Sequence, residues 1–180
     1  DDKKAFQGLQ LLSAKPVLYV CNVEEDAAAT GNDFSAKVAT MAADQGAGSV
    51  NISAKIEEEV AALDDEADKA EFLEALGLEE TGLARVIRAG YELLHLITFF
   101  PVGPKEARAW TVRRHSMAPQ AAGVIHTDFE KGFIKAETIA YDDFVGNDGE
   151  QGAKDAGKMR QEGKTYVVQD GDIMLFRFNV

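Results

Sequence analysis

Polar residues follow an apolar run near the start of the chain, at a place where they could read the edge of a nucleobase. The run covers residues 17–21 and leads directly into Asn22 and an acidic loop that includes Glu25. Ligands of open α/β sheets bind beyond the carboxyl ends of the strands. There an Asn amide can accept from an exocyclic amine and donate to a ring nitrogen. The alternative is that Asn22 only turns the chain and the acidic residues cap a helix.

A second polar loop has the same placement. Residues 49–53 read as a short strand, and Ser53, Ala54 and Lys55 stand at its end. In a parallel arrangement this loop could approach the same base as Asn22, because the carboxyl ends of parallel strands lie at one edge of the sheet.

Other residues of the chain are weaker candidates for catalysis or ligand binding. Residues 152–158 have the Gly-x4-Gly-Lys spacing of a phosphate loop, but Met159 stands where a Mg²⁺-binding hydroxyl belongs and no buried strand comes before. The only cysteine, Cys21, reads as a core residue. The acidic run 57–59 reads as a solvated helix face. Three histidines lack metal-ligand spacing and read as surface or capping residues: His95, His115 and His126.

The elements that must position the two polar loops follow a strand–helix–strand pattern. A helix is expected over 33–42, where Phe34, Val38 and Met41 share one face. This order favours a parallel sheet, and the unbroken apolar run at 17–21 predicts a strand buried on both faces. Two strands are few for such a sheet, so the unit is expected to be incomplete at its N-terminus. Further helices are expected over about 3–13, 54–63, 66–76 and 80–95.

From residue 96 the pattern changes to short strands and turns. We expect a β-hairpin, a short helix, a strand, a second helix and a final β-hairpin. The first hairpin pairs 96–100 with 107–112, and the final hairpin pairs 165–168 with 173–178. Between them, the helices cover 119–125 and 153–162, and the strand covers 134–139.

Composition limits the class of protein. The chain has 180 residues, of which 46% are apolar and 28% charged, and a net charge of −12. This balance fits a globular protein and argues against one that coats nucleic acid by bulk charge. Residues 1–95 carry 8 basic and 19 acidic groups, a net charge of −11, while residues 96–180 carry 11 and 12, a net of −1. This asymmetry predicts two units with different roles.

The same counts bear on location. One cysteine excludes an internal disulfide framework and suits a reducing, cytoplasmic setting. Since no apolar run approaches about 18 residues, we expect no transmembrane helix. The first residues do not read as a signal peptide.

Two regions carry a family resemblance. The segments KPVLYVCNVEE (15–25) and NISAKIEEE (51–59) resemble the fourth and fifth nucleotide-specificity loops of a P-loop GTPase-type domain. The segment EARAWTVRRHSMAPQAAGVIHTDFEKGFIKAETIAYDDF (106–144), followed by AGKMRQEGKTYVVQDGDIMLFRFNV (156–180), closely resembles the C-terminal region of the YchF / Obg-like ATPase family, including its TGS domain. The resemblance covers nearly all of the chain.

The resemblance implies a preference for ATP over GTP. Guanine-specific relatives read Asn-Lys-x-Asp, whose Asp accepts from the N1–H and the N2 amine of guanine. Here Val23 replaces the Lys and Glu25 replaces the Asp, and the longer acid cannot keep the same bidentate geometry. By this resemblance Asn22 reads the adenine edge, and Val23 packs against the base or hydrogen-bonds it. Ser53 and Ala54 approach from the second loop, and Glu25 belongs to the base loop or is structural.

The resemblance also implies parts that lie elsewhere. The phosphate-binding loop, the switch loops and the Mg²⁺-binding Asp of the family are expected upstream of Asp1, so ATP and Mg²⁺ are cofactors of a longer parent. The chain is then a C-terminal fragment without a catalytic or metal-binding residue, and alone it should not hydrolyse ATP. The parent is expected to be a slow ATPase whose nucleotide state controls association with the ribosome, as the large subunit or the 70S particle, with no membrane partner.

Basic residues of the second half could face RNA. Arg side chains beside aromatic rings can hold phosphates and stack on bases, and TGS domains serve as binding modules in several translation-linked proteins. The aromatic residues Trp110, Phe129 and Phe133 themselves read as core. The alternative is that the basic groups only solubilise this half. The candidate contacts are Arg108, Arg113, Arg114, Lys131 and Lys135.

The expected fold class is α/β: an incomplete P-loop NTPase (Rossmann-like) parallel sheet followed by a β-grasp-like TGS domain. Residues 1–14 end a coiled-coil arm helix, 15–80 form the C-terminal part of the NTPase domain, 81–95 a connecting helix and 96–180 the TGS domain. Two other functions stay open. One is a nucleotide-independent TGS module that binds RNA or the ribosome, and the other is a true GTPase that tolerates the altered loop.

Overall fold

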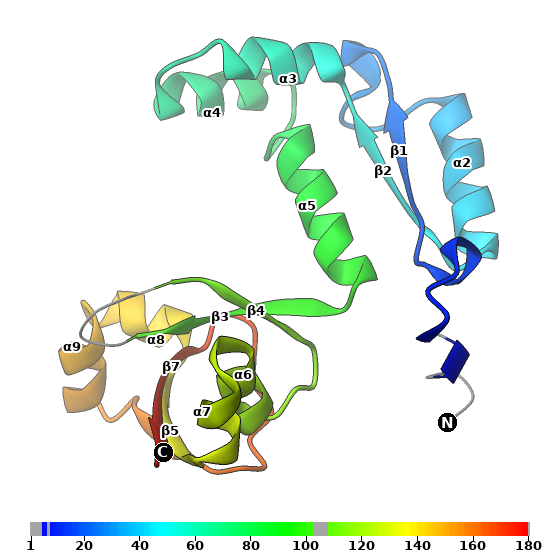
Figure 1. The fold of residues 1–180 in the computed structure, drawn as a ribbon. Coiled ribbons are helices and arrows are strands. Elements are labelled where there is room, and N and C mark those ends of the chain that lie inside the picture. The colour runs from blue at the N-terminus through cyan, green and yellow to red at the C-terminus, as the bar shows by residue number, and fades with distance from the viewer. Residues whose placement is uncertain (1–4, 7, 103–107, 180) are drawn as a thin grey trace. The chain divides into compact units, whose positions relative to one another are not determined.

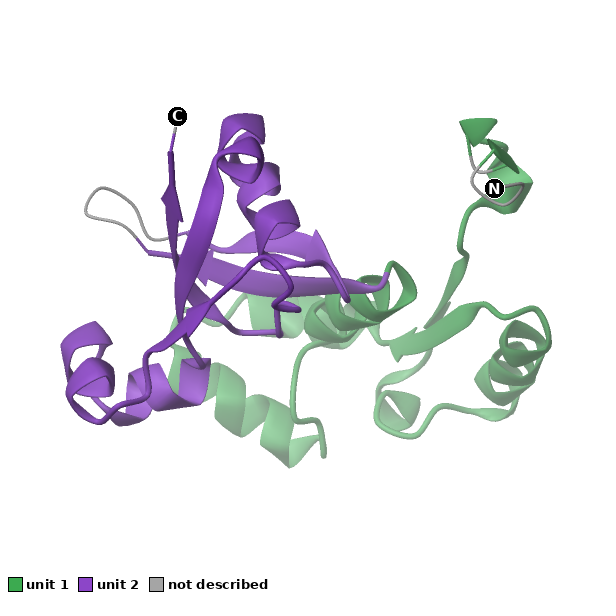
Figure 2. Cartoon of the chain, turned by 90° about the horizontal axis from the view of Figure 1, so that it is seen from below, with its two compact units in different colours: residues 1–94 green, residues 95–180 purple. Residues whose placement is uncertain are grey.

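The chain folds into two compact units, residues 1–94 (unit 1) and 95–180 (unit 2), coloured separately in Figure 2. The structure is a computed structural model, and it describes residues 5–6, 8–102 and 108–179. The helix predicted over 3–13 lies partly outside the described residues. Each unit has a buried apolar cluster of its own.

Unit 1 contains two parallel strands that pair with each other. Leu18 lies opposite Gly48 at one end of the pair, and Asn22 lies opposite Ile52 at the other. Helices α2 (Asp33–Asp44) and α5 (Gly82–Leu93) pack against these strands and lie on opposite sides of them in Figure 1. The strands and helices predicted over 17–94 are confirmed within a few residues. The remaining elements of unit 1 are η1 (Leu12–Ala14), β1 (Leu18–Asn22), η2 (Glu25–Ala27), β2 (Gly48–Ile52), α3 (Ala54–Ala61) and α4 (Glu66–Ala75).

Helix α2 begins at a capping box that follows a tight turn. Asn32 Oδ1 accepts from the N–H groups of Phe34 and Ser35, and Ser35 Oγ accepts from the Asn32 N–H at 2.8 Å. Gly31, just before, has a φ of +77°, and a Cβ there would lie 2.6 Å from Asn51 Nδ2. Only glycine fits both the left-handed backbone and this close approach. The turn therefore fixes where the chain leaves the β1 loop and enters α2.

The expectation that β1 is buried on both faces is wrong. Val20 is 47% exposed, and Cys21, expected in the core, is half-buried. The described structure gives β1 one strand neighbour and two helices that cover it only in part, and an apolar run does not reveal how well its neighbours cover it. The buried core of unit 1 lies instead around α3 and α4, and it consists of Ala28, Ile56, Val60, Leu73 and Leu78.

Unit 2 is built on a five-stranded mixed sheet in the order β4-β3-β7-β5-β6. Strands β3 and β7 run parallel, and the other neighbours are antiparallel. The predicted pairing of the first two strands, the short helix after them and the strand over 134–139 are confirmed. The elements are β3 (Leu96–Pro101), β4 (Trp110–Arg113), α6 (Ala118–Ile125), α7 (Thr127–Lys131), β5 (Phe133–Ile139), α8 (Tyr141–Gly146), α9 (Glu150–Asp155), β6 (Arg160–Glu162) and β7 (Ile173–Phe178).

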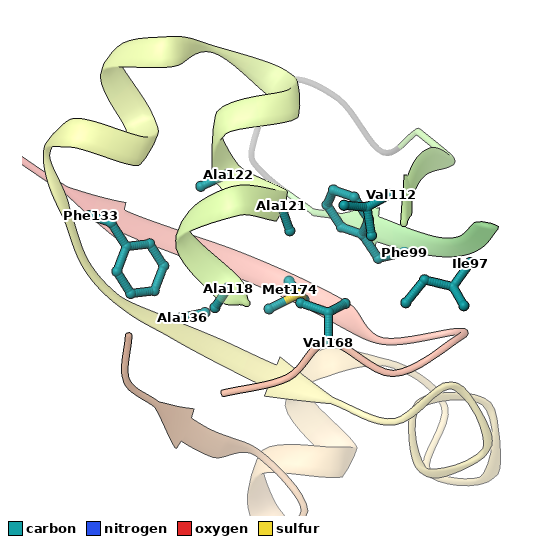
Figure 3. Close-up of a cluster of buried hydrophobic side chains, with 10 residues drawn as sticks. All are labelled: Ile97, Phe99, Val112, Ala118, Ala121, Ala122, Phe133, Ala136, Val168 and Met174. Carbon is teal, nitrogen blue, oxygen red and sulfur yellow. The ribbon is translucent and has the colours of Figure 1, made fainter. Parts of the chain in front are cut away.

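The main core of unit 2 lies between α6 and one face of the sheet (Figure 3). Three alanines of α6 leave room for larger side chains such as Phe99 and Met174, both fully buried. As predicted, the three aromatic residues belong to the core: Phe133 is buried, and Trp110 and Phe129 pack against it. The buried residues are Ile97, Phe99, Val112, Ala118, Ala121, Ala122, Phe133, Ala136, Val168 and Met174.

Two expectations for the end of the chain are wrong. The helix predicted over 153–162 ends at Asp155, since Gly157 has a φ of +70°, and residues 160–162 form β6 beside β5. The final hairpin does not form, because β7 lies between β3 and β5 and both its edges are occupied. Residues 165–168 make only an isolated bridge, between Val167 and Met117.

Candidate functional site

The two candidate base loops lie at the same edge of the parallel strand pair. Asn22 ends β1 and stands opposite Ile52, the last residue of β2. The Val23 N–H donates to the Ile52 carbonyl oxygen at 2.8 Å, so the pairing continues beyond the strands. This register places loop 22–25 beside loop 53–55.

A hydrogen bond joins the two loops. The Ala54 N–H, at the start of α3, donates to Asn22 Oδ1 at 2.9 Å, and both residues are exposed. The bond satisfies a helix N–H that receives no cap from the Ser53 side chain. It also engages the acceptor side of the Asn22 amide, whose nitrogen carries two donors. Asn22 therefore holds the second loop and still offers donors at the edge.

An ion pair joins the same loops a second time. The Lys55 ammonium donates to Glu25 Oε1. The hydrogen bond to Glu25, followed by the charge of that carboxylate, raises the pKa of Lys55 above its usual value. Glu25 thus has a cationic partner within the protein.

The side chains of Val23 and Ser53 are buried. Val23 is 9% exposed and Ser53 is 2% exposed. Among these four predicted base contacts, Asn22 and Ala54 are exposed, while Val23 and Ser53 are buried within the loops that carry them.

A cavity of about 380 Å³ opens beside β1, a volume within the rough range of 300–1,000 Å³ of small-molecule sites. It contains Asn22 and Val23 but is not lined by Glu25, Ser53 or Ala54. Two of the five predicted base contacts therefore line this cavity, and the other three do not. The lining residues are Tyr19, Val20, Cys21, Asn22, Val23, Asn32, Phe34, Ser35 and Val38.

The chain is similar to known proteins along its whole length. The family profile YchF-GTPase_C, described as a protein of unknown function (DUF933), matches residues 96–179. "Ribosome-binding ATPase YchF" of Haemophilus ducreyi is 56% identical over 100% of this chain and 49% of its own length. "Obg-like ATPase 1" of Rattus norvegicus is 44% identical over 94% of this chain and 43% of its own. The solved "Structure of the Schizosaccharomyces pombe YchF GTPase" superposes with a TM-score of 0.78 at 36% identity, over 97% of this chain and 46% of that one.

The chain belongs to the YchF / Obg-like ATPase family. It spans about half the length of the curated relatives it matches. The identity extends through both units, and the family profile covers unit 2 almost entirely.

In this YchF-family chain the weaker candidates have structural explanations. Residues 152–158 form part of α9 and its end, and a Cβ at Gly152 would lie 1.8 Å from the Asn147 carbonyl oxygen, so close packing accounts for this glycine. His126 Nδ1 accepts from the Asp128 N–H at 3.2 Å and caps α7, as predicted for a capping histidine. No group of three potential metal ligands gathers anywhere in residues 5–6, 8–102 or 108–179. Across the same residues, none of the helices combines the length and hydropathy needed to cross a bilayer.

The basic residues of unit 2 do not gather in one patch. Arg113 and Lys135 both alternate with buried residues, Val112 and Ala136, that face the α6 side, so they project from the opposite face of the sheet. Two strands separate them, and Lys131 lies on α7, 3.6 Å from Asp128.

The other two arginines flank β4. The Arg108 guanidinium stacks over the Trp110 ring at 5.2 Å, while the Arg114 side chain is exposed after the strand. The Lys135 ammonium donates to Gln161 Oε1 at 3.0 Å and lies 4.0 Å from a Glu137 carboxylate oxygen. Arg113 and Arg114 are thus consecutive exposed residues at the end of β4, and two strands lie between Arg113 and Lys135.

Two residues of unit 1 have roles that the sequence reading missed. Lys55 pairs with Glu25, and the opposite charges at the ends of neighbouring strands were the signal that could have revealed it. The carboxylate of Glu57 accepts from the Gly82 N–H at 2.6 Å and the Leu83 N–H at 3.0 Å. The reading of 57–59 as a purely solvated face is therefore wrong for Glu57, which caps α5.

Proposed function

We propose that this chain is the C-terminal part of a ribosome-associated P-loop NTPase that binds and hydrolyses ATP with Mg²⁺ in the cytoplasm. Its relatives carry the names "Ribosome-binding ATPase YchF" and "Obg-like ATPase 1". On this proposal the phosphate-binding loop and the Mg²⁺ site belong to the half of the relatives that the chain does not span. ATP is the substrate, and Mg²⁺ neutralises charge on its phosphates.

The observation that carries the proposal is the hydrogen bond between Asn22 and Ala54. It ties together the two loops that follow neighbouring parallel strands, at the edge where α/β sheets bind ligands. Asn22 presents amide donors there, and these suit a ring nitrogen of a purine. Val23 shapes the adjacent cavity with its buried side chain, and Ser53 and Ala54 complete the second loop.

The proposed base is adenine. A guanine reader needs a carboxylate at the fourth position of the loop, placed to accept from two guanine donors. Here that position holds the longer Glu25, which already pairs with Lys55, and Val23 stands in place of a lysine. Both features favour ATP over GTP.

We also propose that unit 2 is a β-grasp-like TGS domain that contacts the ribosome or RNA. The support is a five-stranded mixed sheet, in the order β4-β3-β7-β5-β6, with α6 on one face. The boundaries proposed with it are a coiled-coil arm end at 1–14, an NTPase part at 15–80, a connecting helix at 81–95 and the TGS domain at 96–180.

The test of the ATPase uses the longest natural chain that contains this sequence. Hydrolysis of ATP and GTP is measured with Mg²⁺ at equal concentrations, with the 180-residue piece as control. We expect ATP turnover to exceed GTP turnover and the piece to be inactive. Asn22→Ala should raise KM for ATP roughly tenfold, equivalent to about 1.4 kcal/mol. Equal or greater turnover of GTP would contradict the assignment of Asn22 and Val23 to adenine.

A second candidate function, ribosome binding by unit 2 without nucleotide, is supported by two consecutive exposed arginines, Arg113 and Arg114. Co-sedimentation with ribosomes is measured with and without ATP for wild type and for Arg113→Ala/Arg114→Ala. The matched control, Lys154→Ala/Lys164→Ala, removes the same charge from exposed positions of the same unit. Loss of association only in the arginine variant would support this surface, and equal association of both variants would exclude it.

A further inference from the structure

We propose that Lys55 is a positioning residue that sets purine specificity, by holding the Glu25 carboxylate so that it is not available to a guanine base. The proposal rests on the proposed function, since it assumes that loops 22–25 and 53–55 bind the base. It adds a residue and a mechanism of discrimination that the loop sequence alone does not contain.

Guanine and adenine differ in what they require from the protein at this edge. Guanine presents donors at N1 and N2 and an acceptor at O6, so its reader needs a carboxylate and an N–H group. Adenine presents an acceptor at N1 and a donor at N6. A bare carboxylate near adenine N1 would face a lone pair and repel it.

Both groups that could serve guanine are engaged within the chain. The candidate acceptor, the Glu25 carboxylate, accepts from the Lys55 ammonium. The candidate backbone donor, the Ala54 N–H, is bound to Asn22 Oδ1 at 2.9 Å. With both engaged, the Asn22 amide nitrogen is an exposed donor at this edge that suits a purine acceptor.

The Glu25–Lys55 pair contributes little to folding stability. The Lys55 side chain is 65% exposed and that of Glu25 is 37% exposed, and ion pairs with such exposure contribute little to folding stability. Lys55 also feels the negative charges of Glu59 and Glu24. Removing it would leave Glu25 and these neighbours as an uncompensated acidic group beside the base loops.

The experiment measures dissociation constants for ATP and GTP on the longest natural chain that contains this sequence, by displacement of a fluorescent ATP or GTP analogue. Lys55→Met should lower the ratio of the GTP to the ATP dissociation constant at least tenfold. Lys55→Arg keeps the charge and should retain the wild-type ratio. Lys69→Met is the matched control, because Lys69 also pairs with a glutamate, Glu66, but lies on α4.

A double-mutant cycle isolates the route through Glu25. If Lys55 acts by holding Glu25, Lys55→Met should have no effect on the ratio when Glu25→Ala is already present. Melting temperatures of all variants verify that they are folded. The proposal would be overturned if Lys55→Met left the ratio of dissociation constants unchanged, or if Lys55→Arg lowered it as much as Lys55→Met does. It would also be overturned if Lys55→Met still lowered the ratio in the Glu25→Ala background.

The experiment distinguishes failure of this inference from failure of the proposed function. If wild type binds ATP, and Asn22→Ala weakens that binding while Lys55→Met leaves the ratio unchanged, only the role of Lys55 is lost. If wild type binds neither nucleotide, the base site itself is wrong, and the role of Lys55 falls with it.

Discussion

At the scale of single residues, unit 2 buries the hydroxyl group of Thr138 completely. Thr138 is completely buried on β5, and its Oγ1 has no hydrogen-bond partner among the described residues. An unpaired buried hydroxyl costs about 1–3 kcal/mol. We expect Thr138→Val, which keeps the shape, to raise the free energy of unfolding by about 1 kcal/mol.

Urea unfolding of the full chain, followed by fluorescence of Trp110, the only tryptophan, measures this change. Thr165→Val is the control, because its hydroxyl is on an exposed residue and the effect should stay within about 0.5 kcal/mol. A lower stability of Thr138→Val would show that the hydroxyl has a partner in solution.

Tyr166 makes the stability of unit 2 depend on alkaline pH. Its hydroxyl donates to Asp172 Oδ2 at 2.7 Å, and the Gln169 N–H donates to the same oxygen at 2.8 Å. Burial, followed by the hydrogen bond to Asp172, raises the pKa of Tyr166 to about 12. The folded state therefore favours the neutral phenol. This contribution is complete below the ordinary pKa of about 10 and is lost as the pH rises from about 10 to about 12.

A spectrophotometric titration of tyrosinate absorbance checks this shift. Of the four tyrosines, one should ionise near pH 12, and Tyr166→Phe should remove that phase. Asp172→Asn should move it toward 10, because the anionic acceptor is lost, with circular dichroism as the test of folding. If Tyr166→Phe removes a phase near pH 10 instead, Asp172 does not hold the phenol.

At the scale of elements, a side chain of α3 caps α5. Glu57 accepts from the first two N–H groups of α5, and Thr81 Oγ1 accepts from the Ala84 N–H at 3.1 Å. A carboxylate at a helix N-terminus also interacts favourably with the helix dipole. Glu57→Ala should therefore cost about 1–2 kcal/mol of stability in unit 1.

Thermal unfolding by circular dichroism and amide hydrogen exchange at Gly82 and Leu83 measure this loss. Glu58→Ala is the matched control, since the neighbouring carboxylate is exposed. Equal losses in both variants would mean that the helix end is held by Thr81 alone.

At the scale of the whole molecule, the two units differ in how completely they bury apolar surface. The main buried cluster of unit 2 has ten residues, and Ile139, Ala153 and Ile173 form a second one. Unit 1 leaves Val17, Val20 and Phe34 exposed beside its two strands. Stability follows buried apolar area, so unit 2 should fold without unit 1.

A piece covering residues 95–180 tests this expectation. It should unfold cooperatively in urea, with the same Trp110 transition midpoint as the full chain. A piece covering residues 1–94 lacks Trp110, so its unfolding in urea is followed by circular dichroism. It should show a lower midpoint than the 95–180 piece or self-association, because exposed strand edges pair readily. Loss of a cooperative transition in the 95–180 piece would show that unit 2 depends on the rest of the chain.

The sequence by itself determined most of the local elements and indicated the family. Periodic apolar residues mark α2 and α5, and an apolar run followed by Asn22 marks β1 and its base loop, because these signals reside within ten or twelve neighbouring residues. The segments that resemble YchF proteins span both units. The predicted base contacts themselves stay predictions, although the structure brings Asn22 and Ala54 together.

Only the tertiary structure decided which distant segments meet. The pairing of β7 with β3 and β5, instead of with residues 165–168, depends on which sheet edges are free. Lys55 and Glu25 are 30 positions apart in the sequence, and Glu57 is 25 positions from Gly82, the first residue of α5. Opposite charges at the ends of neighbouring strands are compatible with the Lys55–Glu25 contact, but the sequence specifies neither contact, because both form only once parallel strands and packed helices bring distant segments together.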